Sequence, residues 1–509
     1  MAERQQQETP RWLLATAVML TTIMVILDTT IVNVSLPHMM GALGATSDQI
    51  TWVLTTYIVA NAIFIPMTGH FATLLGRKRL LLISITGFVI SSGMCGQAHS
   101  LVEMVVFRAF QGAFGAPVIP LSQAVLVDAF PPQERGRAMG LWGIGVMLGP
   151  ILGPTLGGYI TETINWRWVF YINVPVGVAN VLMVMRYLPG AEARRAPADW
   201  WGALLMALGI GSMQLMLDRG NEDNWFDSGH ILALTLISAV SLVWFVVRSW
   251  GRDDAILQID LLKDRNLALS SGMMAVFGLG MFGTVILQPI MLEQLFDYPA
   301  QTTGLVMAPR GLGAAFTMFM VSRLIGRVDA RVLILIGLCL SSLGAYIMTG
   351  YNLEIDRWWI IWPSVVQGLG LGMIFVPVTT LAYDTLPQAA TDHAAALFNL
   401  SRTVGSSIGI SIAGTVLSRE TQVNWNQLAG YTSPFNPAFH HWLTVQGQSV
   451  GDPHTARLLA NMVSRQATMV ALVDAFWFIT ISMIALAPLV FLLRKAQRRR
   501  DHQGPAAMS

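Results

Sequence analysis

Charged residues are scarce in this chain: Lys, Arg, Asp and Glu make up only 12% of its 509 residues, while 54% are hydrophobic. A soluble domain carries about 25% charged residues. With so few charges, most of a water-facing surface would have no charged side chains. The formal net charge of +2 gives no support to nucleic-acid binding. The composition therefore predicts an all-α polytopic protein whose surface faces membrane lipid.

Cysteine is almost absent, with only Cys95 and Cys339, each in an apolar run. This excludes a disulfide framework and a cysteine-rich metal site, and we expect neither a metal nor a cofactor. The phosphate-binding pattern G-x-x-x-x-G-K-[ST] is also missing, so ATP is not the expected energy source. A G-x-S-x-G match at 405–409 and a G-x-G-x-x-G match at 278–283 lie inside apolar helices, away from any strand, and we expect no enzymatic activity.

Fourteen apolar runs are long enough to cross a membrane as helices, which takes about 20 residues each. The first run is too long for a signal peptide and lacks a small-residue cleavage site, so we expect it to remain as a span. The runs at 200–217 and 231–250 have one re-entrant pair as an alternative. The expected spans are 12–36, 50–71, 79–98, 102–126, 138–161, 168–188, 200–217, 231–250, 267–292, 303–324, 331–350, 358–382, 394–417 and 468–493.

The distribution of Lys and Arg predicts the orientation. With the N-terminus in the cytoplasm, 22 of these residues fall in cytoplasmic segments and six on the opposite side. Both ends are therefore expected inside. One cytoplasmic segment, 383–392, departs from the rule because its only charges are Asp384 and Asp392. The polar outer segment 418–467 is predicted to form a small folded appendage.

The two ends of the chain contain a repeat. Seven features recur 256 positions later at Gln367-Gly368, Asp384, Pro387, Ala394, Leu397, Gly405 and Gly409; the first copies are Gln111-Gly112, Asp128, Pro131, Ala138, Leu141, Gly149 and Gly153. Gly76-Arg77 recurs as Gly326-Arg327. A parallel repeat predicts two six-helix halves, 1–190 and 266–509, with a two-helix insert at 191–265 and a substrate path between the halves.

Two ionisable residues lie within expected spans, and the hypothesis of proton coupling rests on them. Asp28 lies in the first span and Arg108 in the fourth. A charged side chain at membrane depth is costly, so it must face the interior and pair or titrate. We predict that Asp28 carries a proton and that Arg108 tunes it. The alternative is a structural ion pair that holds the helices together.

The fifth expected span contains a ladder of glycines and prolines: Gly145, Gly149, Pro150, Gly153, Pro154, Gly157 and Gly158. Glycines four residues apart allow close helix contact, and the prolines weaken the helix and let it bend. We predict a tight, bendable face between the two halves. The loop after the second span adds Gly69, Gly76 and Arg77. Its glycines support a tight turn, and positive-inside topology alone explains its charge.

Several polar or aromatic residues within the spans are candidates for a substrate cavity. Each has the alternative of a purely structural role in helix packing. Asn399 and Arg402 share one helix face, which must point inward. The candidates are Asn33, Gln111, Gln123, Phe282, Gln288, Glu293, Arg310, Gln367, Asn399 and Arg402.

Taken together, these motifs resemble the major facilitator superfamily, and more narrowly its fourteen-helix drug:proton antiporters of the EmrB/QacA type. The residues that carry the resemblance are the run 27–34 around Asp28, the run 108–115 that begins with Arg108, the ladder 145–158 and the stretch 166–177. It extends over nearly the whole chain. One departure is Thr73, where the family has an acid that latches the gate, which puts that latch in doubt.

The resemblance implies export of hydrophobic compounds in exchange for protons across the inner membrane of a bacterium. It also implies two protein partners, a periplasmic adaptor of the EmrA kind and an outer-membrane channel of the TolC kind. Two alternatives stay open: a proton-coupled uptake symporter, against which the ladder argues, and a membrane receptor or scaffold that transports nothing.

Overall fold

The computed structural model describes residues 11–190, 199–252, 254–325, 327–387, 390–433, 435–449 and 452–494. Within these ranges the chain is helical, apart from one isolated bridge between Ile325 and Val328. The N-terminal helices are α1 (Arg11–Leu43), α2 (Ser47–Phe64), α3 (Thr68–Leu75), α4 (Arg77–Gln97), α5 (Leu101–Gly115), α6 (Val118–Ala129), α7 (Pro132–Thr163), α8 (Trp168–Tyr171) and α9 (Asn173–Tyr187). The prediction of an all-α protein is confirmed.

Several expected spans are interrupted by proline, which removes a backbone donor and disturbs the preceding turn. The second expected span is broken near Pro66 into α2 and α3, and the fourth near Pro117 into α5 and α6. Each broken pair still forms one continuous rod, at Gln49–Leu75 and Leu101–Ala129. The breaks therefore bend these spans without ending them.

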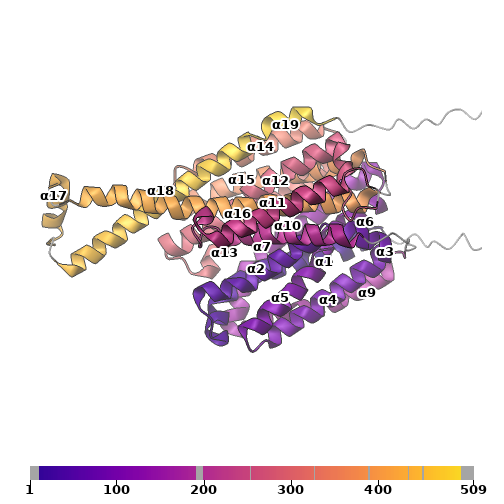
Figure 1. The fold of residues 1–509 in the computed structure, drawn as a ribbon. Coiled ribbons are helices and arrows are strands. Elements are labelled where there is room, and N and C mark those ends of the chain that lie inside the picture. The colour runs from indigo at the N-terminus through magenta and orange to yellow at the C-terminus, as the bar shows by residue number, and fades with distance from the viewer. Residues whose placement is uncertain are drawn as a thin grey trace, which may run out of the picture.

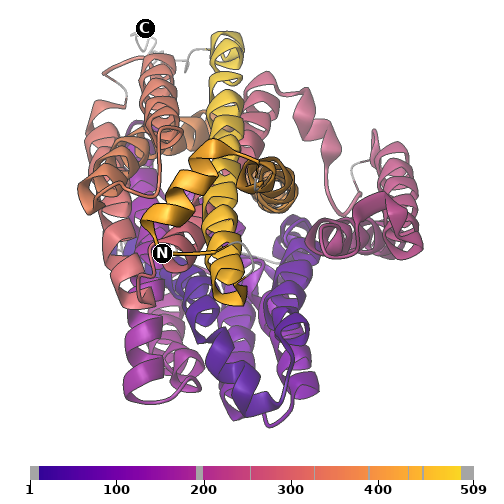
Figure 2. The same ribbon diagram turned by 90° about the vertical axis from the view of Figure 1, so that its left-hand side faces the viewer.

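The insert forms two separate helices, α10 (Trp200–Arg219) and α11 (Gly229–Ser249), each long and apolar enough to cross a membrane, which favours two spans over one re-entrant pair. They pack on each other beside α2, at one side of the bundle in Figure 2. The remaining elements are α12 (Arg265–Ile290), α13 (Ala300–Leu324), α14 (Ala330–Met348), α15 (Arg357–Asp384), α16 (Thr391–Ala429), α17 (Pro437–Val445), α18 (Pro453–Ile484) and α19 (Ala487–Leu492), with short turns η1 (Trp225–Asp227), η2 (Ile259–Lys263), η3 (Met291–Leu295) and η5 (Gly430–Thr432).

Twelve of the described helical segments are long and apolar enough to cross a membrane. The expected fifth and thirteenth spans correspond to α7 and α16, which have 32 and 39 residues but are not among those twelve. The count of fourteen is therefore not confirmed, although both helices lie within the bundle. The division of the chain at residues 190 and 265 stays a prediction.

The polar segment 418–467 is not a separate appendage after a short span. Helix α16 continues without a break to Ala429, and α18 begins at Pro453, so the two helices extend as a hairpin that carries α17 at its tip. Figure 1 shows this hairpin projecting beyond the ends of the other helices. The thirteenth expected span ends at residue 417, whereas the helix that contains it continues to Ala429. A helix can leave the membrane and continue in water when its polar groups are solvated.

The glycine contacts show that the repeat is structural. In the first half, side chains at Gly149 or Gly153 would overlap α1 around Ile26 and Thr30. In the second half, their repeat partners Gly405 and Gly409 meet α12 in the same way, at Ala275 and Leu279. The same pairwise packing is thus built twice.

The glycine ladder does not lie between the halves, contrary to the prediction. Gly145, Gly149, Gly153 and Gly157 all face α1, inside the N-terminal half. The contact between halves uses the preceding turns of α7, where three other glycines approach α13: Gly136 meets Ile325, Gly140 meets Ser322, and Gly143 meets Met318. The sequence pattern identified a tight helix face but not the helix that it meets.

Adjacent glycines at the end of the ladder provide a matched test of this packing. A β-carbon at Gly157 would lie 2.8 Å from the Ile31 carbonyl oxygen, whereas one at Gly158 would lie 3.8 Å from Val34 Cγ1. We expect Gly157→Ala to destabilise the protein by about 1–3 kcal/mol through overpacking, and Gly158→Ala to leave stability unchanged or raise it. Thermal unfolding of the purified variants measures the difference. Equal melting temperatures would show that α1 and α7 are not packed this closely.

Candidate functional site

A buried ion pair lies at the centre of the N-terminal half. Asp28 of α1 and Arg108 of α5 are 0% and 1% exposed, and Arg108 Nη1 donates to Asp28 Oδ2 at 2.7 Å. Two amide groups donate to the other carboxylate oxygen, from Gln111 at 2.9 Å and from Asn173 at 2.7 Å. The carboxylate is therefore held by three donors on two helices, α5 and α9.

Arg108 is fixed from a further side by α2. Its Nε donates to the Val53 carbonyl oxygen at 3.0 Å, and its guanidinium carbon lies 4.2 Å from the centre of the Tyr57 ring. The network thus joins α1, α2, α5 and α9. Loss of the charge on Asp28 would leave Arg108 without its counter-charge, so a change at one carboxylate affects the contacts of four helices.

Sequence reasoning missed two members of this network, Asn173 and Tyr57. Asn173 lies in the stretch 166–177, which had been noticed only as a family feature. Its polar amide in an otherwise apolar run is a signal for an interior partner. Tyr57 gave no such signal, because tyrosine is common in membrane helices. Its neighbour across the interface, Gly112, was noted only as part of the repeat, although a side chain there would overlap the Tyr57 backbone.

A second charged cluster joins the halves at the predicted cytoplasmic end. Arg77, at the start of α4, forms an ion pair with Asp128 at the end of α6 in the same half. Its Nε also donates to both carboxylate oxygens of Asp392, at 2.7 and 3.0 Å. Because Asp392 begins α16, this bond crosses from one half to the other. Asp392 therefore supplies an acid for a cross-half bond, although Thr73 stands at the position of the family's acid.

Closer to the middle of the bundle, a polar cluster also crosses between the halves. Asn399 of α16 donates to Gln123 of α6 at 2.5 Å, and the Tyr383 hydroxyl of α15 forms a hydrogen bond to the same amide oxygen at 3.1 Å. Two of the expected cavity residues are thus bonded to each other. Both Gln123 and Asn399 are buried in this conformation.

The other cavity candidates are distributed over several environments. Gln288 and Gln367 lie within the C-terminal half, where they donate to Ser364 at 2.7 Å and to Thr284 at 3.2 Å. Asn33 and Glu293 are exposed. Arg310 is buried on α13 and Arg402 partly buried on α16. The side chains of Phe282, Pro150 and Pro154 lie outside the described residues. The structure therefore does not bring the ten candidates together as one site.

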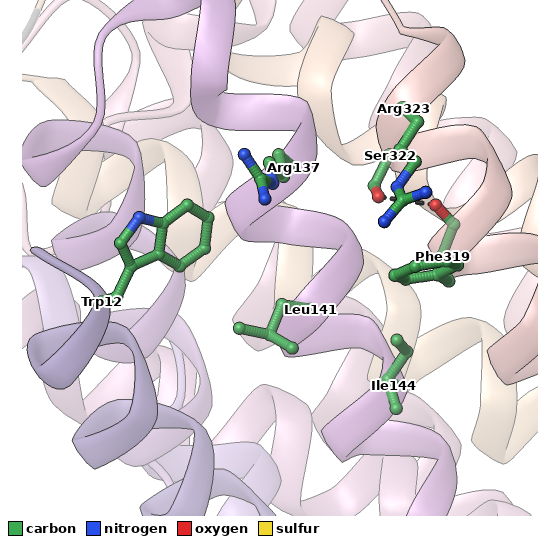
Figure 3. Close-up of a pocket in the computed structure, with 7 residues that line it drawn as sticks. All are labelled: Trp12, Arg137, Leu141, Ile144, Phe319, Ser322 and Arg323. Atoms are coloured by element: carbon green, nitrogen blue, oxygen red, sulfur yellow. Dashed lines mark hydrogen bonds between the residues drawn. The ribbon is translucent and has the colours of Figure 1, made fainter.

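A groove of about 370 Å³ opens between the halves at the predicted cytoplasmic end. Figure 3 shows Arg137, Leu141 and Ile144 of α7 between Trp12 of α1 and the three residues of α13, Phe319, Ser322 and Arg323. The two guanidinium groups lie over aromatic rings, Arg137 over Trp12 and Arg323 over Phe319. None of its lining residues belongs to the buried network of Asp28, so the groove is separate from that network.

Comparison with known proteins shows the family of the chain. The sequence model of the Major Facilitator Superfamily matches residues 18–410. Multidrug export protein EmrB of Haemophilus influenzae is 35% identical over 489 residues, which cover 95% of each chain. Fatty acid resistance protein FarB of Neisseria gonorrhoeae is 34% identical over 474 residues, 92% of this chain and 94% of FarB.

Solved structures show the same fold at low sequence identity. The proton:xylose symporter XylE aligns with a TM-score of 0.61 at 12% identity and covers 96% of both chains. The human organic anion transporter MFSD10 aligns with a TM-score of 0.59 at 14% identity, over 93% of this chain and 99% of that one.

The ion pair gives a stability prediction. Arg108→Gln leaves the Asp28 carboxylate without its counter-charge, and we expect a loss of roughly 3–5 kcal/mol. The double variant Asp28→Asn/Arg108→Gln removes both charges and should be more stable than Arg108→Gln alone. Thermal unfolding in detergent measures the series, with Arg186→Gln at an exposed arginine as the control. A double variant no more stable than Arg108→Gln would contradict a direct pair.

The cross-half bond gives a conformational prediction. Asp392→Asn removes a charge-assisted bond worth about 1.5–3 kcal/mol, so the population with separated ends should rise at least tenfold. Spin labels at Leu75→Cys and Thr385→Cys measure the distance, in a Cys339→Ser background because Cys95 is buried. The control is Asp254→Asn, which breaks an exposed pair with Arg252. An unchanged distance distribution in Asp392→Asn would show that this bond does not hold the halves together.

Proposed function

Because the chain belongs to the Major Facilitator Superfamily, we propose that it exports hydrophobic and amphipathic drugs in exchange for protons. The transport cycle is alternating access, in which the two halves open in turn to either side of the membrane. The role is transport, not catalysis, and needs no cofactor beyond the proton gradient.

The relatives support drug export as the activity. The Haemophilus protein is a multidrug export protein and the Neisseria protein confers fatty acid resistance, and this chain aligns with more than nine-tenths of each. EmrB of Escherichia coli K12, also a multidrug export protein, is 35% identical over 483 residues. Full-length similarity to several exporters favours export over uptake.

The observation that carries the proposal is the buried pair of Asp28 and Arg108. A carboxylate with no exposed surface, held by one cation and two amides, is out of contact with water in this conformation and gains contact only when the surrounding helices move. This property is what a coupled carrier needs, because the proton is released only in one conformation. Asp28 takes the proton from the outside, and Arg108 stabilises the ionised form from which drug is bound.

The contacts between the halves fit the closed-inside stage of such a cycle. The bond of Arg77 to Asp392 and the cluster of Gln123, Tyr383 and Asn399 must both break before drug can enter from the cytoplasm. Protonation of Asp28 would loosen the four helices that it joins. The N-terminal half moves as a unit in this proposal. Its movement links protonation of Asp28 to the breaking of the contacts with the C-terminal half.

The proton gradient supplies enough energy for export. One proton that crosses a potential of 100 mV releases about 2.3 kcal/mol, and a pH difference of one unit adds about 1.4 kcal/mol. The sum of about 3.7 kcal/mol per proton supports a drug gradient of several hundred-fold.

We further propose that the chain works in the inner membrane, with both termini in the cytoplasm, as part of a tripartite system. A periplasmic adaptor of the EmrA kind and a channel of the TolC kind would complete the route. The projecting hairpin supports the adaptor, because its tip exposes apolar side chains to water. Phe435 is 93% exposed, and Tyr431 and Val445 are also exposed. We take this tip as the contact surface for the adaptor, since large exposed apolar patches mark protein interaction sites.

Uptake by symport is the main competing function. It requires that drug and proton move in the same direction, so an inward proton gradient would concentrate substrate on the inside. Export by antiport predicts the reverse. The direction of proton movement on drug addition therefore separates the two.

Proton release from energised inverted vesicles tests the proposal. Addition of a hydrophobic drug should dissipate the internal acid gradient in wild type and not in Asp28→Asn, since the amide carries no exchangeable charge. Asp227→Asn, at an exposed acid in η1, is the control and should behave as wild type. A response that is equal in Asp28→Asn would move the proton site elsewhere, with Glu293 the next acid to test. No response to any drug in wild type would contradict export.

A further inference from the structure

The groove between α7 and α13 lies on the seam between the two halves and takes no part in the network of Asp28. Ser322 of α13 lines the groove, and a side chain at Gly140 of α7 would overlap Ser322. The groove is therefore a depression of about 370 Å³ beside a closely packed contact. A molecule that occupies it touches both halves at once.

Three helix ends place the groove at the boundary between membrane and water. Helix α1 begins at Arg11, Arg137 lies in the second turn of α7, and Arg323 lies in the last turn of α13. Trp12 is exposed at the groove, and tryptophan is typical of this boundary. Since the Lys and Arg distribution places these ends on the cytoplasmic side, the groove faces the cytoplasmic leaflet.

The charge of the groove is positive and unpaired. Arg137 and Arg323 are exposed, and neither guanidinium group forms an ion pair or a hydrogen bond with another residue of the described chain. The guanidinium carbon of Arg137 lies 5.0 Å from the centre of the Trp12 ring, and that of Arg323 lies 4.2 Å from a ring of α13. Glu134, the nearest acid along α7, is exposed and forms no ion pair with Arg137. Both cations are free to bind an anion.

The rest of the groove is apolar and continues along the membrane. Leu141 and Ile144 of α7 and Phe319 of α13 line it farther from the helix ends (Figure 3). Phe316 and Leu312 precede Phe319 by three and seven residues, and all three are exposed. Because this spacing puts them on one face of α13, an apolar track leads from the groove towards the middle of the membrane.

Two cations at the boundary and an apolar track beside them match the chemistry of an anionic phospholipid. Its phosphate accepts charge-assisted hydrogen bonds from guanidinium groups, and its acyl chains are as long as the track requires. The cytoplasmic leaflet is rich in such lipids, and basic pockets between membrane helices on this side bind their headgroups. A zwitterionic lipid offers the same chains but no net charge to offset the two cations.

We propose that the groove between α7 and α13 binds an anionic phospholipid of the cytoplasmic leaflet, with its phosphate at Arg137 and Arg323 and one acyl chain along the apolar track of α13. This lipid site goes beyond the proposed drug export and does not depend on it. Because the two cations come from different halves, the lipid contacts both sides of the seam. It must leave, or lose one cation, when α7 and α13 separate.

Native mass spectrometry of the delipidated full-length protein tests the site. The probes are phosphatidylglycerol and phosphatidylcholine with the same palmitoyl and oleoyl chains. Wild type should bind its first phosphatidylglycerol about tenfold or more tightly than phosphatidylcholine, because two basic side chains attract the anionic lipid. Arg137→Gln/Arg323→Gln should bind both lipids alike. The control Arg186→Gln/Arg265→Gln removes the same charge from two exposed arginines outside the groove and should keep the preference.

The variant Leu141→Trp separates the groove from charge alone, because it fills the apolar part and keeps both cations. It should weaken binding of the first phosphatidylglycerol about tenfold, since the lipid can then reach the cations only from the surface. Unchanged binding in Leu141→Trp would overturn the site, as would equal affinity of wild type for the two lipids or loss of the preference in the control.

The same spectra distinguish a lipid from a second copy of the chain. A dimer that forms without lipid and is lost in Arg137→Gln/Arg323→Gln would assign the groove to a protein contact and overturn the proposal. A monomer that takes up one phosphatidylglycerol in preference supports it. Since binding is measured without drug or proton flux, a failure of drug export in wild-type vesicles would contradict the proposed function and leave this result in place.

Discussion

The buried ion pair of Asp28 and Arg108 is the interaction on which the rest of the N-terminal half depends. Neither charge reaches solvent, so each must be neutralised by the other and by fixed dipoles. Satisfying them brings α1, α2, α5 and α9 into one arrangement. A buried pair of this kind adds little stability compared with apolar packing, but the loss of either charge leaves the other buried and unpaired, which is strongly destabilising. In the proposed function, this dependence on one charge is what couples the helices to a proton.

Close packing of helices makes the pair possible. Glycines of α7 bring its backbone against α1, and glycines of α16 bring its backbone against α12, by the same pattern. Such rigid helix pairs transmit a local change over a distance, because a close-packed interface does not deform gradually. Among the described residues, few polar bonds join the two halves. The bond of Arg77 to Asp392 is the strongest type among them, because both groups are charged. A stiff half with a breakable contact is the mechanical basis of alternating access.

The sequence predicted the helices, the repeat and the interior position of Asp28 and Arg108, because these depend on hydropathy, on spacing and on the cost of charge in lipid. It did not predict which helix each glycine meets, since a small-residue face carries no information about its partner. For the same reason Asp392 was noted only as an exception to the charge rule, and its bond to Arg77 depends on tertiary structure. The hairpin of α16 and α18 was missed because hydropathy locates membrane boundaries and not helix ends.

The most direct measurement of the central claim is an infrared difference spectrum of the protein in lipid, recorded as drug is added over a series of pH values. If drug binds the form in which Asp28 is ionised, binding should remove the carbonyl band of a protonated carboxylic acid, with the expected isotope shift in heavy water. The band should be missing in Asp28→Asn. A spectrum without such a band at any pH, or with the same band in Asp28→Asn, would contradict the assignment of the coupling proton to Asp28.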